Sequence, residues 1–64
     1  MTTNPVERIR VLEAELAALV ARRASIEAEM QASRSRARME ELREERYETL
    51  VNIDAVRIEL EAYQ

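Results

Sequence analysis

Apolar residues recur at alternating spacings of three and four along two stretches of this 64-residue chain. The first stretch runs from Ile9 to Met30 and the second from Met39 to Tyr63. This spacing places each set of residues along one side of an α-helix, forming the seam of a helix that packs lengthwise against a partner helix. The pattern therefore predicts two amphipathic helices and an all-α fold.

The segment at residues 33–38, with the sequence SRSRAR, separates the two seams. If the first seam continued past Met30, its next positions would be Ser33 and Ala37, whereas the second seam begins at Met39, two residues after Ala37. One uninterrupted coiled coil tolerates insertions of three or four residues, so a slip of two favours a turn. We therefore predict one domain over residues 1–64, with a helix at about 5–32, a turn at about 33–37 and a helix at about 38–63.

A chain that doubles back at this turn forms an antiparallel helical hairpin, that is, a two-helix coiled coil. The facing seam residues are then Ile9 with Tyr63, Leu12 with Leu60, Leu16 with Val56, Leu19 with Ile53, Arg23 with Thr49, Ile26 with Arg46, and Met30 with Leu42. A domain-swapped dimer of continuous helices, each about 90 Å long, gives the same pairs and remains an alternative.

The residues beside the seams carry complementary charges at most levels of this hairpin. On one flank the predicted neighbours are all complementary: Glu13 with Arg57, Val20 with Leu50, and Glu27 with Arg43. On the other flank Arg8, Arg22 and Glu29 can reach Glu59, Glu45 and Arg38, but the axially nearer partners include Glu15 with Glu59 and Glu29 with Glu45, which repel. Exposed ion pairs contribute only about 0–1 kcal/mol each, so we expect them to select the register while the apolar layers stabilise the fold.

Both helices have sequence signals for their N-termini. Asn4 is a suitable N-cap, Pro5 suits the first helical position, and Glu7 could complete a capping box. Ser33 or Ser35 could cap the second helix. The chain contains no Gly that could end the first helix in a left-handed conformation.

Three polar residues, Arg23, Arg46 and Thr49, occupy seam positions near the middle of the hairpin. One interpretation is that the arginine stems pack in the core while their heads reach Glu27, Glu45 or solvent. The other is a polar core layer that fixes the register or binds an anion.

Some apolar residues lie outside the two seams and predict a partner interface. Val51 and Ile58 lie on the side of the second helix that faces away from the first, and Val11 and Ala18 lie on an alanine-rich side of the first helix. Apolar patches of this kind are typical of interaction surfaces. We predict that a second copy covers this surface and forms a homodimeric four-helix bundle, with another helical protein as the alternative partner.

The amino-acid composition excludes several kinds of chemical site. The sequence contains no Cys and no His, so it offers no disulfide and none of the usual zinc or iron ligand sets. We expect no catalytic residues, no cofactor and no metal site. The longest apolar run is too short to cross a membrane, and the N-terminus lacks the pattern of a secretory signal, so we expect a cytoplasmic protein.

Arg34, Arg36 and Arg38 form a basic tip at the turn, which could contact a phosphate or another anion. Contact with nucleic acid through this tip is therefore an alternative function. Against it stand the formal net charge of −3 and the lack of aromatic residues around the tip that could stack on bases.

The stretch LEAELAALVARR at residues 12–23 resembles the first helix of the small all-helical chorismate mutases, and Glu45-Arg46-Tyr47 is similar to a second-helix segment of some members. The resemblance implies that Arg23 and Arg34 bind substrate carboxylates, although Val6 stands where the family has its first active-site arginine. This implies a truncated mutase-like enzyme as an alternative. The leading prediction is a non-enzymatic interaction module that acts as an adaptor, assembly or regulatory subunit.

Overall fold

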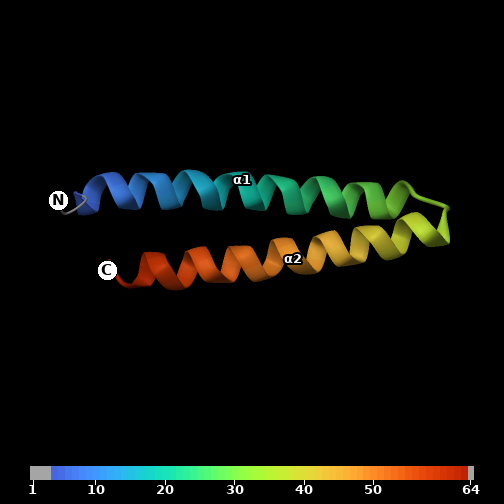
Figure 1. The fold of residues 1–64 in the computed structure, drawn as a ribbon. Helices are drawn as coiled ribbons and strands as arrows, with labels where there is room; N and C mark the ends of the chain where they lie inside the picture. Colours follow the sequence, from blue (N-terminus) through green and yellow to red (C-terminus); the bar gives the residue numbers. More distant parts are fainter. Residues whose placement is uncertain (1–3, 64) are drawn as a thin grey trace.

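The computed structural model describes residues 4–63 and contains two α-helices, α1 (Pro5–Ala32) and α2 (Arg36–Glu61). The helices run antiparallel, and both ends of the chain lie at the end of the molecule opposite the turn (Figure 1). The molecule measures 50 × 20 × 14 Å. A single continuous helix would be about 90 Å long, so the predicted helical hairpin is confirmed.

The start of α1 follows from three consecutive residues. The Asn4 side chain accepts a hydrogen bond of 2.9 Å from the Val6 N–H, and Pro5 occupies the first helical position. That position has no intrahelical partner for an N–H, so proline costs nothing there. The sequence therefore determines where this helix begins.

The turn consists of residues 33–35 and is shorter than the predicted span of 33–37. Ser33 has extended dihedral angles, φ −76° and ψ 138°, and its N–H still donates to the Glu29 carbonyl at 2.8 Å. Its hydroxyl accepts from the Ser35 N–H at 3.3 Å. The Ser35 hydroxyl in turn accepts from the Arg38 N–H at 3.2 Å and caps α2. No residue within 4–63 has a positive φ, so this turn requires no glycine.

The core is a narrow stripe between the two helices. Its buried apolar residues are Leu12 and Ile26 of α1 and Leu42 and Ile53 of α2, and most other seam residues are half-buried. Burial of this stripe excludes apolar surface from water and supplies most of the stability of the hairpin. The stripe also divides the remaining surface of each helix into two flanks.

Two predicted seam positions lie outside this core. Arg46 is exposed, while the neighbouring Glu45 is half-buried, and Tyr63 at the open end of the hairpin is 41% exposed. With Leu42 and Thr49 facing α1, positions 45 and 46 lie on opposite sides of the line between them. Arg46 stays in solvent, where its guanidinium remains hydrated, so the predicted pairing of Ile26 with Arg46 is wrong.

Two isoleucines of α2 provide a matched test of this core. Ile53 is 1% exposed and Ile58 is 67% exposed. Ile53→Ala should lower the free energy of unfolding by about 2–5 kcal/mol because it leaves a cavity, whereas Ile58→Ala should cost well under 1 kcal/mol. Urea denaturation followed by circular dichroism, at low protein concentration, measures both. Equal losses would contradict the position of the core.

Candidate interaction surfaces

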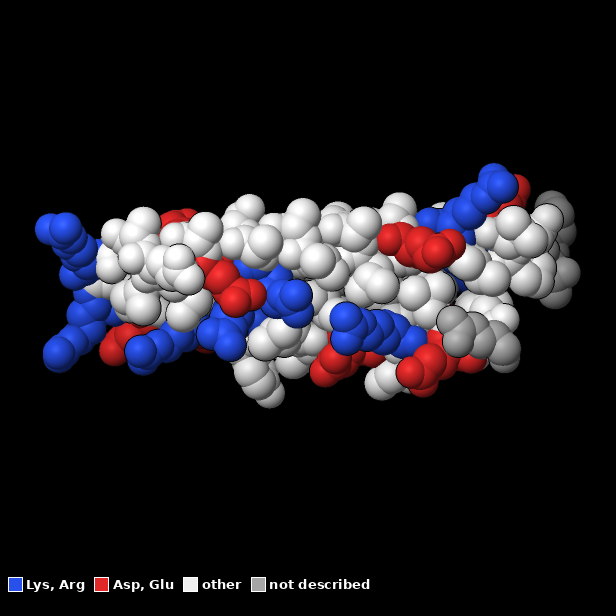
Figure 2. Space-filling model, turned by 180° about the vertical axis from the view of Figure 1, so that it is seen from behind, with Lys and Arg blue, Asp and Glu red and all other residues white. Residues whose placement is uncertain are grey.

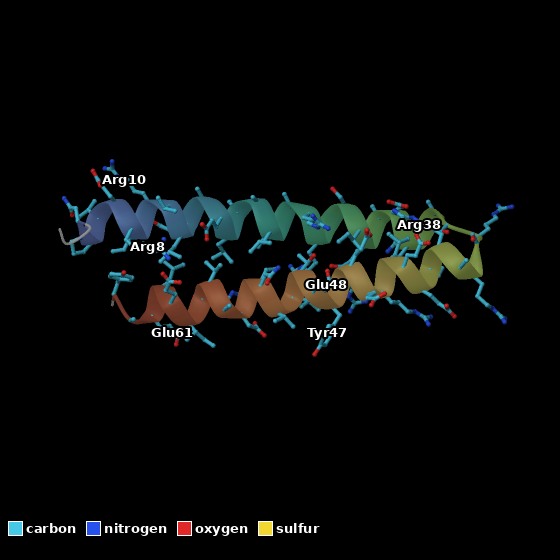
Figure 3. All side chains as sticks on the ribbon, viewed as in Figure 1. Arg8, Arg10, Arg38, Tyr47, Glu48 and Glu61 are labelled. Carbon is cyan, nitrogen blue, oxygen red and sulfur yellow. The ribbon has the colours of Figure 1, made fainter. Side chains whose placement is uncertain are left out.

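One long face of the hairpin is closed by ion pairs between the helices; we call it the ion-paired face. Arg8 binds Glu59, with its Nε donating to Glu59 Oε2 at 2.8 Å, and Arg38 Nε donates to Glu29 Oε2 at 2.7 Å. Arg8 and Arg38 mark the two ends of this face in Figure 3. Both pairs match the sequence prediction. A shallow hollow on this face is lined by Glu15, Ala18, Leu19, Asn52, Ala55 and Val56.

The opposite face, which we call the alanine face, has a different character. Its α1 flank forms a hollow lined by Glu13, Leu16, Ala17, Val20, Ala21 and Ala24. On α2, Leu50 and Arg43 line a second hollow, together with Arg46 and Tyr47. Asn52 lies on the ion-paired face, and helical spacing puts Leu50 on the other side of the buried stripe. The hollow that contains Leu50 therefore lies on the alanine face, like the hollow on α1.

The predicted ion pairs of the alanine face do not form within the hairpin. Among residues 4–63, no ion pair joins Glu13 to Arg57 or Glu27 to Arg43. Glu27 instead forms an ion pair with Arg23 of its own helix, with 3.4 Å between Arg23 Nε and Glu27 Oε1. The predicted pairing of Arg22 with Glu45 on the other face is also absent from this part of the chain. Exposed charges have little to gain from pairing, so each can remain in water.

The four predicted interface residues are all exposed. Val11 is 47% exposed, Val51 48% and Ile58 67%, while Ala18 lines the hollow of the ion-paired face. Tyr47, which is not among the predicted interface residues, lies four residues before Val51, is 69% exposed and points away from α1 (Figure 3). A spacing of four residues puts Tyr47 and Val51 on the same side of the helix, and this spacing could have identified Tyr47 from the sequence. The predicted residues thus lie on both helices and share no single hollow among those described.

The predicted polar layer of Arg23, Arg46 and Thr49 is not formed as one unit. Thr49 is buried, and its hydroxyl donates to the Glu45 carbonyl of the same helix at 2.7 Å. Arg23 is half-buried and reaches Glu27, as the first interpretation expects. Arg46 is exposed. None of the bonds described for these residues crosses between the helices.

The basic tip is divided by its ion pairs. Arg38 donates to Glu29 and also to Glu41, at 2.9 Å, and these hydrogen bonds raise the pKa of its guanidinium. Arg34 and Arg36 are exposed and line a hollow at the turn that also includes Arg43 and Glu40. Arg38 therefore serves to join the two helices, which leaves Arg34 and Arg36 as the exposed cations of the tip.

The two arginines that the mutase resemblance implies do not line one hollow. Arg23 lies in the middle of α1, whereas Arg34 lies in the turn, and the hollow at the turn is lined by Arg34 without Arg23. Residues 4–63 contain no group of three or more acidic side chains placed to hold a metal ion. Neither α1 nor α2 is long and apolar enough to span a membrane.

Comparisons of the chain with protein families, with curated proteins and with solved structures found no match.

The bonding of Thr49 predicts the effect of removing its hydroxyl. Thr49→Val should raise the free energy of unfolding by about 0.5–1 kcal/mol, because a buried methyl replaces an oxygen that bonds only within its own helix. The Glu45 carbonyl keeps its helical bond to the N–H of residue 49. Thr49→Ser, which keeps the hydroxyl and removes a methyl, should be destabilising. A loss of stability in the valine variant, measured by thermal denaturation, would instead support a structural role for the hydroxyl.

The Arg38 hydrogen bond lowers the pKa of Glu29 below its usual value of 4.5. The pair therefore stabilises the fold above about pH 4.5, and that contribution is lost as the pH falls through the lowered pKa of the folded state. NMR titration of the Glu29 carboxyl should show the depressed pKa. Arg38→Ala should return it towards 4.5, whereas Arg36→Ala should leave it low. A normal pKa in the unmodified chain would contradict this pair.

Proposed function

We propose that this hairpin is a non-enzymatic interaction module that associates with a second copy of itself and binds helices of other proteins. Its role would be that of an adaptor, an assembly subunit or a regulatory subunit. The mechanism is the burial of apolar helix surface that the hairpin leaves exposed. An enzymatic function would require chemistry at a site, whereas this one requires only that such surface be covered.

The small core carries the proposal. Within residues 4–63, the buried apolar side chains are Leu12, Ile26, Leu42 and Ile53. A single core in a domain of about this size rarely supplies more than about 3–5 kcal/mol of stability, and association is one of the usual ways to add to it. A partner that binds only the folded state also stabilises it by mass action.

The exposed apolar residues support the same proposal. Val11, Tyr47, Val51 and Ile58 are large side chains in contact with water, on a surface otherwise rich in charge. Tyr47, Val51 and Ile58 follow one another along the outer side of α2 at helical spacing, which is how a helix presents residues to the groove of a partner. This outer stripe and the alanine face are therefore the two candidate surfaces for partners.

The sequence also limits covalent catalysis. It contains no His and no Cys, so no imidazole is present to activate Ser25, Ser33, Ser35 or a tyrosine. The exposed polar groups are mainly guanidinium and carboxylate groups spread around both helices. Such groups are typical of solvated helix surfaces and of the polar rim of an interface.

Self-association can be measured on the purified chain. Light scattering should give a mass near twice the 7.4 kDa of one chain, and small-angle X-ray scattering should show a compact particle. The apparent melting temperature should rise with protein concentration, because dimerisation stabilises the folded state. A folded chain that stays at 7.4 kDa, with a melting temperature independent of concentration, would refute self-association.

A further inference from the structure

We propose that the second copy packs on the alanine face, with both turns at the same end, so that α1 of each copy lies antiparallel on α2 of the other. This inference rests on the proposed self-association and identifies the surface and the orientation that it uses. It gives a four-helix bundle in which every neighbouring pair of helices is antiparallel. The outer stripe of Tyr47, Val51 and Ile58 stays free for other partners.

Shape and polarity favour the alanine face. Leu16, Val20 and Leu50 are half-buried there, at the edge of the core, so a covering helix would complete their burial. The α1 side chains that surround them are alanines, at positions 17, 21 and 24, and they are exposed. Small side chains allow a second helix to approach closely.

The ion-paired face is a poorer surface for this purpose. Arg8 with Glu59 and Arg38 with Glu29 bridge the helices at its two ends and are each part-exposed. A covering helix would have to remove water from both pairs, and desolvation of charges is costly. The alanine face carries no such bridge between the helices within residues 4–63.

Charge then selects the occupant. On the alanine face, α1 carries two carboxylates, Glu13 and Glu27. On α2, three guanidiniums lie on this face, those of Arg43, Arg46 and Arg57, and helical spacing puts the carboxylates of Asp54 and Glu61 on the outer part of the same flank. Figure 2 shows this face: uncharged surface covers most of α1 at the top, arginine side chains lie along α2 and at the turn, and acidic side chains lie below the arginines on the half of α2 farther from the turn. A second copy places its own Glu13 and Glu27 against these arginines and its arginines against Glu13 and Glu27, and this exchange makes the two rows complementary between copies.

The register of the hairpin fixes the orientation. The pairs Arg8–Glu59 and Glu29–Arg38 place Glu13 within about one helical turn of Arg57 along the molecule. A half-turn about the long axis preserves these levels, so Glu13 of one copy meets Arg57 of the other. Because the interface is two-fold symmetric, this contact occurs twice. The reverse orientation, with the turns at opposite ends, would bring Glu13 towards Glu27 and Arg43 towards Arg57, and both contacts repel.

Charge reversal tests this arrangement. Glu13→Arg and Arg57→Glu should each weaken the homodimer about tenfold or more, since two attractive contacts become repulsive. An equimolar mixture should restore the affinity as a heterodimer, detected by native mass spectrometry. Within each chain of the mixture, residues 13 and 57 still carry like charges, so recovery must come from contacts between copies. The double variant E13R/R57E should dimerise like the unmodified chain, which also checks that both substituted positions permit folding.

Glu48→Arg is the matched control, since it makes the same charge change on α2 beside Asn52, away from the alanine face (Figure 3). It should leave the dimer unchanged. Loss of the dimer in E48R or in V51E/I58E, with E13R unaffected, would overturn the alanine face while leaving self-association intact. A monomeric unmodified chain would instead refute self-association itself. If mixing E13R with R57E restores no dimer, and the alanine face binds an added acidic amphipathic peptide instead, the occupant of this face is another protein and the proposal is overturned.

The orientation has its own test, because the sequence has no cysteine and an introduced thiol is unique. Arg34→Cys places a thiol at the turn. With both turns at one end, mild oxidation should link the two chains of one dimer without changing the mass of the particle. With the turns at opposite ends, the same oxidation would join separate dimers into larger species, which would overturn the proposed orientation.

Discussion

The architecture depends on how little apolar surface two helices can hide from water. In a hairpin, each helix has only one neighbour, so only the residues that point directly at that neighbour are excluded from solvent. Leu12, Ile26, Leu42 and Ile53 fill this position, and residues one step around the helix, such as Leu16 and Leu50, are half-buried. The fold is therefore determined by a single stripe of contacts, and the rest of the surface remains available to partners.

Charges refine this arrangement without holding it together. The hairpin has two long faces, and only one of them has ion pairs that cross between α1 and α2. On that face, Arg38 contacts Glu29 and Glu41 at once, which links the end of α1 to the first turns of α2. On the other face, the charges of α1 and α2 stay apart within the molecule. This asymmetry, more than the net charge of −3, distinguishes the two faces as candidates for binding.

The sequence predicted the features that follow from strong local rules. The spacing of apolar residues identified both helices and the side of each that packs, and Asn4 with Pro5 marked the start of α1. It was less informative where competing states have similar free energies. Arg46 and Glu45 straddle the buried line, so a small rotation of α2 decides which is half-buried. Exposed ion pairs contribute little, so a pattern of complementary charges could not tell that Arg8 pairs with Glu59 whereas Glu13 and Arg57 remain apart.

The serine turn has a consequence for how the molecule opens and closes. Because residues 33–35 connect the helices directly, contacts near Met30 and Leu42 close a short loop and lose little chain entropy when they form. Contacts such as Arg8 with Glu59 close a loop that spans most of the chain and can form only when the intervening levels are in place. The contacts nearest the turn should therefore form first during folding, and local unfolding should begin at the opposite end of the hairpin.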